Sequence, residues 1–379
     1  MIIQDRLTQT FGNLVRIDSP SRREGAVAAF IRQKLEKLGF EVKEDSAGKI
    51  LEGETGNLIA SLRGSAPAKP IGFSAHMDTV QPGTGIEPVV ENGVIKSAGE
   101  TILGSDDKAA IAAFLEAAEV IKENNLPHGD IQGIFTIWEE GGLNGSRNLD
   151  YELIHAEEVF VMDSNGPVGS IVNQGPSHDH LQVDFKGRAA HAGMEPENGI
   201  SAVQMAARAV ERMKLLRVDE YTTANIGTIQ GGIATNIVPE KVTITAEARS
   251  LQDDRLREQT KAMVRAIEDA AADFGGEADL QVKRLYSAFE LEESDPMIIT
   301  LKEVLRGLGK EPAIVASGGG SDTNHFNAQG LKAVNLSVGM SKVHTVEEYI
   351  SVEELSNCAK MVLEIVRAYC DAGCSPVGH

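Results

Sequence analysis

The sequence predicts an α/β protein with a parallel-rich sheet, helices on both faces, and a smaller inserted α+β domain. Three observations support this prediction. Short apolar runs alternate with helix-like patterns in residues 1–177, the pattern changes in residues 178–289, and the first pattern returns in residues 290–379. We therefore expect one domain from residues 1–177 and 290–379, and a second domain from residues 178–289.

The first segment contains strands separated by helices. Apolar residues at helical spacing predict a helix over residues 27–38, and Gly39 supplies its end. A second helix is predicted over residues 109–121. Short, largely apolar runs predict buried strands at residues 57–62, 71–75, 131–138 and 159–162.

The inserted segment has a different order of elements. Alternation of Val242, Ile244, Ala246 and Ala248 is typical of a half-buried strand. Strands are predicted at residues 180–185, 224–230, 241–249 and 280–285, and helices at residues 200–213 and 256–274. The resulting order, βαββαβ, is that of a ferredoxin-like unit with an antiparallel sheet.

The last segment returns to the first pattern. Apolar runs predict strands at residues 313–316 and 333–338. Ser351 and Glu354 form a capping-box pattern, which predicts that the final helix begins there.

Composition excludes several classes of protein. The 379 residues include 36 basic and 56 acidic side chains, a formal charge of -20, which argues against nucleic-acid or anionic-membrane partners. No apolar run approaches the ~20 residues of a membrane-spanning helix, and the N-terminus shows no signal-peptide pattern. The three cysteines, Cys358, Cys370 and Cys374, form no disulfide framework, and Cys370 and Cys374 with His379 lack a fourth metal ligand. We expect a cytoplasmic protein.

Histidines and carboxylates follow several of the predicted strands. In open parallel sheets, ligands bind at the carboxyl ends of strands. Each motif alone has an ordinary explanation, such as a polar strand end, a favourable partner of a helix dipole, or an exposed loop. Together they supply two imidazoles and three carboxylates, from His76, Asp106, Glu140, Asp163 and His344.

This set of residues predicts a two-metal hydrolytic site. Two imidazoles, three carboxylates, one of them shared, and a bridging water complete the ligands of two divalent cations. The three carboxylates and the hydroxide formed from that water balance the four positive charges. Mixed imidazole and carboxylate ligands suit two Zn²⁺ per chain, with Co²⁺ or Mn²⁺ as alternatives. Glu139 stands beside a ligand and is the natural general base for that water. Asp78 stands two residues after His76 and is placed to orient its ring.

Four segments resemble a known family. The chain is similar to the di-zinc exopeptidases that include peptidase T, carboxypeptidase G and the aminoacylases. The order and spacing of the segments agree along nearly the whole chain. The segments are residues 74–80 (SAHMDTV), 103–108 (LGSDDK), 139–141 (EEG) and 319–322 (GGSD), with Ser19-Pro20-Ser21 near the start.

The resemblance implies a fold and roles for individual residues. It implies a zinc-exopeptidase fold with His76, Asp106, Glu140, Asp163 and His344 as ligands. Asp106 is then shared by both metals and joined to Asp107 by a cis peptide bond. Glu139 is implied as the base and Asp78 as the residue that orients His76.

The resemblance also assigns a role to the inserted domain. It implies that this domain is a lid and the interface of a homodimer. His191 would reach the active site of the other subunit and stabilise the tetrahedral oxyanion. Asn236 and Arg249 match substrate-contacting positions.

Within the family, the chain looks most like peptidase T, an aminotripeptidase. It differs at Gly318, where peptidase T has an arginine directly before its Gly-Gly-Thr-Asp segment. That change removes a bidentate carboxylate clamp. The interpretation is an aminopeptidase for short peptides. A deacylase acting on N-acyl amino acids, a carboxypeptidase, and a non-catalytic binding relative are the alternatives.

Overall fold

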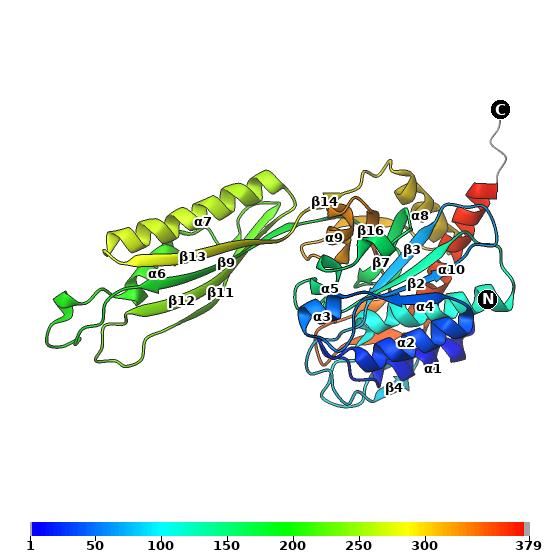
Figure 1. The fold of residues 1–379 in the computed structure, drawn as a ribbon, viewed down its shortest axis with the longest axis horizontal. Coiled ribbons are helices and arrows are strands. Elements are labelled where there is room, and N and C mark those ends of the chain that lie inside the picture. Colours follow the sequence, from blue (N-terminus) through cyan, green and yellow to red (C-terminus); the bar gives the residue numbers. More distant parts are fainter. Residues whose placement is uncertain (1, 375–379) are drawn as a thin grey trace. The chain divides into compact units, whose positions relative to one another are not determined.

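The computed structural model describes residues 2–374, and the side chains of residues 2–372. The chain forms two compact units (Figure 1). Unit 1 contains Met1–Asn173, Glu290–Ala316 and Ser321–His379, and unit 2 contains Gln174–Phe289 and Ser317–Gly320. The Ser317–Gly320 segment groups with unit 2 because Gly320 lies against Tyr286, where an added Cβ would be 2.3 Å from the ring.

A nine-stranded mixed sheet forms the centre of unit 1. Its middle strands, β6, β3, β7 and β16, are parallel, whereas the pairs β1–β2, β2–β6 and β8–β16 are antiparallel. The order is β1 (Glu41–Glu44), β2 (Leu58–Leu62), β6 (Ile131–Thr136), β3 (Ile71–His76), β7 (Glu158–Ser164), β16 (Lys332–Ser337), β8 (Ser170–Gly175) and β14 (Phe289–Glu290), with β15 (Ala313–Ala316) paired to β8.

Helices cover both faces of this sheet. On one face Phe114 of α4 packs against Phe73 and Phe135, and on the other Phe326 of α9 packs in a cluster with Ile134 and Val159. The predicted fold class is confirmed. The helices of unit 1 are α1 (Gln4–Val15), α2 (Gly25–Leu38), α3 (Ala47–Leu51), α4 (Ser105–Glu123), α5 (Asn144–Arg147), η1 (Tyr151–Leu153), α8 (Pro296–Gly307), α9 (Asp322–Ala328) and α10 (Val352–Cys374).

Unit 1 also contains a small antiparallel sheet that the sequence analysis did not predict. Its order is β17 (Met340–Ser341), β18 (Tyr349–Ser351), β5 (Val94–Ser97) and β4 (Pro88–Glu91). Asn92 and Gly93 join β4 to β5 with φ values of 52° and 78°, as in a type I′ hairpin turn. The connection between β17 and β18 contains His344, so this sheet helps to position a predicted site residue.

Unit 2 has the predicted βαββαβ order, with one additional short strand. Its antiparallel order is β10 (Leu216–Arg217), β11 (Thr222–Gly231), β12 (Lys241–Ser250), β9 (Ser177–Lys186) and β13 (Glu277–Tyr286). Alternate residues of β9 and β12, such as Val183 and Ile244, form a core with Met205 and Met263 of the helices. The helices are α6 (Ala202–Arg212), α7 (Asp253–Asp273) and η2 (Pro196–Asn198).

Two predicted helix boundaries depend on single residues. Gly39 ends α2 with φ 97°, a left-handed conformation that glycine adopts easily. Ser351 begins α10, where its Oγ accepts the Glu354 N–H at 3.0 Å. No helix in residues 2–374 has the length and apolarity needed to cross a membrane.

The cysteines lie in or near α10. The side chains of Cys358 and Cys370 are buried in this helix. The Cys374 side chain and His379, which the sequence analysis considered together with Cys370, lie outside the described part of the chain.

Phe114 provides a test of the core of unit 1. Its ring lies 5.9, 5.8 and 5.6 Å from the rings of Phe40, Phe73 and Phe135. Because Phe114→Ala leaves a cavity among these rings, we expect it to lower the free energy of unfolding by ~3–5 kcal/mol. Urea denaturation followed by the fluorescence of Trp138, the single tryptophan and a residue of unit 1, measures this loss.

The control is Ile50→Ala, since the Ile50 side chain is 61% exposed. We expect this change to alter the free energy of unfolding by less than ~0.5 kcal/mol. Equal losses in the two variants would contradict the central role of the aromatic cluster.

Candidate active site

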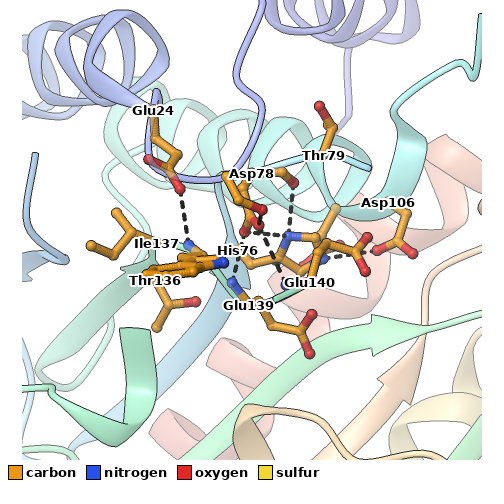
Figure 2. Close-up of polar contacts among 12 residues, drawn as sticks. Glu24, His76, Asp78, Thr79, Asp106, Thr136, Ile137, Glu139 and Glu140 are labelled. Atoms are coloured by element: carbon orange, nitrogen blue, oxygen red, sulfur yellow. Dashed lines mark hydrogen bonds and ion pairs between the residues drawn. The ribbon is translucent and has the colours of Figure 1, made fainter. Parts of the chain in front are cut away.

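The predicted site residues of unit 1 meet where the parallel strands end. His76 is the last residue of β3, and Asp163 stands near the end of β7. Glu139 and Glu140 follow β6, and Asp106 stands at the start of α4. Because β6, β3 and β7 are parallel neighbours, their carboxyl ends lie at one edge of the sheet. Figure 2 shows His76, Asp106, Glu139 and Glu140 gathered together.

Asp106 lies between two histidines. Its Oδ1 is 2.9 Å from Nε2 of His76, and its Oδ2 is 3.2 Å from Nε2 of His344. The same His344 nitrogen is 2.9 Å from Oε1 of Glu140. The Asp106–Asp107 peptide bond is cis, as the resemblance implied. One carboxylate therefore presents a separate oxygen to each imidazole, as a ligand shared by two ions must.

A second group of side chains surrounds His76. Its Nε2 is 3.7 Å from Oδ1 of Asp163. Ligand atoms of His76, Glu139 and Asp163 lie within 4.8 Å of one another, and so do those of His76, Asp106 and Glu140. Glu139, which the sequence analysis interpreted as a base, thus lies as close to this group as the predicted ligands do.

Asp78 holds both His76 and the loop that carries the glutamates. Nδ1 of His76 is 2.9 Å from the backbone oxygen of Asp78 and 3.4 Å from its carboxylate, so the backbone oxygen is the nearer partner. The carboxylate accepts the N–H groups of Glu139 and Glu140 at 2.9 and 3.3 Å. Ser21 donates to the same carboxylate at 2.6 Å, which ties the Ser19-Pro20-Ser21 segment to the site.

Two buried carboxylates near the site were not identified from the sequence. Glu24 accepts the N–H groups of Arg22 and Trp138, both at 2.9 Å, and Figure 2 shows it beside Asp78. Burial, and then the charge of Asp78, raise the pKa of Glu24 to about 7. Glu348 accepts four hydrogen bonds from residues 103–106. Both stand beside other charged residues, a pattern that usually indicates an exposed surface, so their burial was not predicted.

The electrostatics of the site reflect its many acidic groups. Burial raises the pKa values of Glu139 and Asp163 well above their usual range, and it also raises that of Glu140. Burial opposes ionisation of Asp106 too, but hydrogen bonds with His344 and His76 outweigh it and lower its pKa. Hydrogen bonds to Asp106 and Glu140 raise the pKa of His344 to about 10. The site therefore favours positive charge.

The orientation of His76 shows that these residues fit a metal. The contact with the Asp78 backbone oxygen requires a proton on Nδ1. In a neutral His76 ring the lone pair of Nε2 would face Oδ1 of Asp106 at 2.9 Å, with an acceptor on each side. Burial opposes a charge on His76, but hydrogen bonds with Asp106 and Asp78 outweigh it and raise its pKa, so without a metal a proton occupies this position. A cation between them would satisfy both atoms. Imidazole and carboxylate donors suit Zn²⁺, Co²⁺ or Mn²⁺.

The three remaining predicted site residues lie in unit 2. His191 is exposed, and its Nδ1 accepts the N–H groups of Gly193 and Met194 at 3.2 and 3.1 Å. In the neutral ring Nε2 then carries the proton and is a donor. The backbone oxygen of Asn236 accepts the Ala192 N–H at 3.0 Å, which places the loops of His191 and Asn236 side by side.

Arg249 occupies a different environment in unit 2. It lies on β12 and donates to Oε2 of Glu247 at 2.9 Å. His178, whose Nε2 lies 3.3 Å from Oε2 of Glu247, and Arg249 overcome the opposing effect of burial and lower the pKa of Glu247 to about 2. Arg249 is therefore part of an ion pair within unit 2.

Comparisons with known proteins agree with this geometry. The family model described as peptidase family M20/M25/M40 matches residues 72–368. The chain is 43% identical to the Bacillus subtilis (strain 168) protein YqjE over 366 residues, which cover 97% of this chain and 99% of that protein.

Two solved structures are similar over almost their whole length. One is an aminopeptidase PepT from Bacillus cereus ATCC 10987, with a TM-score of 0.91, 42% identity, and coverage of 97% of this chain and 99% of that chain. The other is a tripeptidase from Staphylococcus aureus subsp. aureus Mu50, with a TM-score of 0.95, 39% identity, and coverage of 98% and 100%. The chain therefore belongs to peptidase family M20/M25/M40.

Proposed function

We propose that this peptidase is an aminopeptidase for short peptides, of the tripeptidase type, that works with two Zn²⁺ ions. The observation that carries the proposal is Asp106, whose two carboxylate oxygens each face a different imidazole. The similar structures from B. cereus and S. aureus, an aminopeptidase and a tripeptidase, support the substrate class. The proposed ligands are His76, Asp106, Glu140, Asp163 and His344.

The contacts of the two adjacent glutamates support different roles for them. Glu140 accepts a hydrogen bond from His344, so its carboxylate is already directed at the proposed ion shared with Asp106. The Glu139 side chain makes no hydrogen bond to another described residue, although its backbone N–H is held by Asp78. Glu139 is therefore the carboxylate that remains able to exchange a proton with water.

Hydrolysis then follows from the positions of the chain's own groups. The two cations, when bound, would polarise the substrate carbonyl and lower the pKa of the attacking water. Glu139 accepts a proton from that water and later donates it to the leaving amine. Burial and the nearby Asp163 raise the pKa of Glu139, which favours holding the proton between the two steps.

Unit 2 is proposed to serve as a lid and as the interface of a homodimer. Several large apolar side chains of this unit are exposed, among them Leu216, Ile229 and Ile233, with exposures of 72, 57 and 86%. The Nε2–H of His191 is a donor suited to a developing oxyanion, and we propose that it acts on the site of the partner subunit. Asn236 and Arg249 are proposed to contact substrate.

A deacylase of the same fold is the second candidate. Peptidase T has a guanidinium at the position of Gly318, and without that carboxylate clamp the substrate need not be a tripeptide. N-acyl amino acids lack a free amino terminus, so a substrate panel separates the two candidates.

Glu139→Gln tests the base. The amide keeps the size of the side chain but cannot accept the proton, so we expect turnover to fall by ~10²–10⁴-fold. Metal analysis should still find as much zinc as in the unchanged protein, up to two ions per chain. The exposed Glu52→Gln is the control. Near-normal turnover in Glu139→Gln would require a different base.

The substrate class is tested with di-, tri- and tetrapeptides, C-terminal amides and N-acyl amino acids. We expect free tripeptides to give the highest kcat/KM. Gly318→Arg should then raise kcat/KM by ~10-fold for free tripeptides over their amides, because it adds a carboxylate clamp. No heavy atom lies within 4 Å of a Cβ added at Gly318, so the side chain has room.

Gly318→Gln is the matched control, since it adds a similar length without charge. An equal gain in both variants would argue against a carboxylate clamp. A preference for N-acyl amino acids would favour the deacylase.

The proposed role of His191 is tested by mixing two inactive variants, His191→Ala and Glu139→Gln. Random exchange makes half of the dimers hybrids, and each hybrid has one site with both residues intact, so about a quarter of normal activity should return. Native mass spectrometry verifies the exchange. A monomer in solution, or no recovery after exchange, would exclude action on the partner subunit.

A further inference from the structure

Glu348 is a buried carboxylate that catalysis as proposed does not use. Its residue is 1% exposed, and it stands four residues after His344 in the connection between β17 and β18. Its neighbour Glu347 is exposed and pairs with Lys342. A buried charge of this kind persists only where the surrounding groups stabilise it.

Four donors converge on the Glu348 carboxylate. Oε2 accepts the N–H groups of Leu103 and Gly104 at 2.8 and 2.9 Å. Oε1 accepts the Ser105 hydroxyl at 2.6 Å and the Asp106 N–H at 3.2 Å. All four partners donate, so both oxygens act as acceptors, as in an ionised carboxylate.

These bonds hold a segment of backbone that the helix itself does not hold. Asp106 and Asp107 have non-helical dihedral angles (φ -83°, ψ 103° and φ -118°, ψ 30°), and Gly104 before them has φ 73°. The first N–H groups of a helix have no acceptor within the helix. The carboxylate of Glu348, from a distant part of the sequence, supplies acceptors for these N–H groups. It therefore fixes the position of the Asp106 backbone, from which the side chain projects.

The same connection also carries His344. The Thr345 hydroxyl donates to the Lys342 oxygen at 2.7 Å, and the Glu348 N–H donates to the Thr345 oxygen at 3.1 Å. These bonds form a compact turn between His344 and Glu348. The segment therefore contacts Asp106 twice, at its carboxylate through His344 and at its N–H through Glu348.

The side chains around Asp163 are held in place by different contacts. His76 and Asp163 stand on β3 and β7, which are neighbouring parallel strands of the large sheet. Glu348 makes no hydrogen bond to either of them among the described residues. A change at Glu348 should therefore affect the two halves of the site unequally.

We propose that Glu348 is a positioning residue that acts mainly on the affinity of one ion, the one that Glu140 and His344 bind together with the shared Asp106. Glu348 acts by holding the Asp106 backbone and the segment that carries His344 in fixed positions relative to each other. This inference rests on the proposed two-ion function.

The test is to titrate metal-free protein with Zn²⁺ in competition with a chromophoric chelator. Glu348→Gln replaces one carboxylate oxygen with an NH₂ group that faces two donors. The Asp106 backbone and the His344 segment should then be held less firmly relative to each other. We expect two ions to bind the unchanged protein, and one of them to bind Glu348→Gln ~10–100-fold more weakly, as for other residues that orient metal ligands. The other ion depends on Glu348 only through the shared Asp106, so we expect it to lose clearly less affinity.

Glu347→Gln is the matched control, because it makes the same chemical change at the exposed neighbouring position. It should bind both ions as the unchanged protein does. Normal affinity for both ions in Glu348→Gln, or an equal loss at both, would overturn the inference and leave the proposed function standing. Fewer than two ions in the unchanged protein would overturn the proposed function itself.

Ser105→Ala provides a second variant if Glu348→Gln does not fold. It removes one of the four donors and leaves the carboxylate in place. We expect a severalfold loss of affinity for the same single ion, with the thermal midpoint of the metal-free protein close to normal. Unchanged affinity for both ions, or an equal loss at both, would overturn the inference.

Discussion

Carboxylates crowded around His76 impose the constraint on which the site depends. Like charges in a buried region repel one another, so their positions must be fixed by other groups. The structure does this with carboxylates that are not proposed ligands: Asp78 holds the backbone of Glu139 and Glu140, and Glu24 holds Trp138. A second set of acids thus accepts hydrogen bonds from backbone N–H groups and holds the loops of the site in place, which leaves the first set free to bind cations.

Two sheets share the task of positioning the site. The large sheet fixes His76 and Asp163 directly, because its parallel strands end at the same edge. The small sheet fixes the segment that carries His344, since β18 pairs with β5 and β5 leads toward Asp106. A site built from one sheet alone would lack the second imidazole.

The sequence predicted the parts of this molecule that have strong local patterns. Apolar runs predicted β3, β6 and β7, and apolar residues at helical spacing, ending at Gly39, predicted α2. These elements could be predicted because each carries its own pattern of apolar residues. The small sheet was missed although Asn92-Gly93 is a hairpin turn, since β17 and β18 have only two and three residues. Glu348 was missed because its partners lie more than 240 residues away in the sequence.

Adjacent identical residues show why geometry must complete such a prediction. Glu139 and Glu140 have the same chemistry, and their N–H groups bind the two oxygens of one carboxylate, Asp78. Held in this way, the two side chains point to different neighbours: Glu140 reaches His344, and Glu139 lies with Asp163. The sequence predicts both residues as acidic groups of the site, and the contact of Glu140 with His344 supports the proposal that Glu140 is the ligand and Glu139 the base.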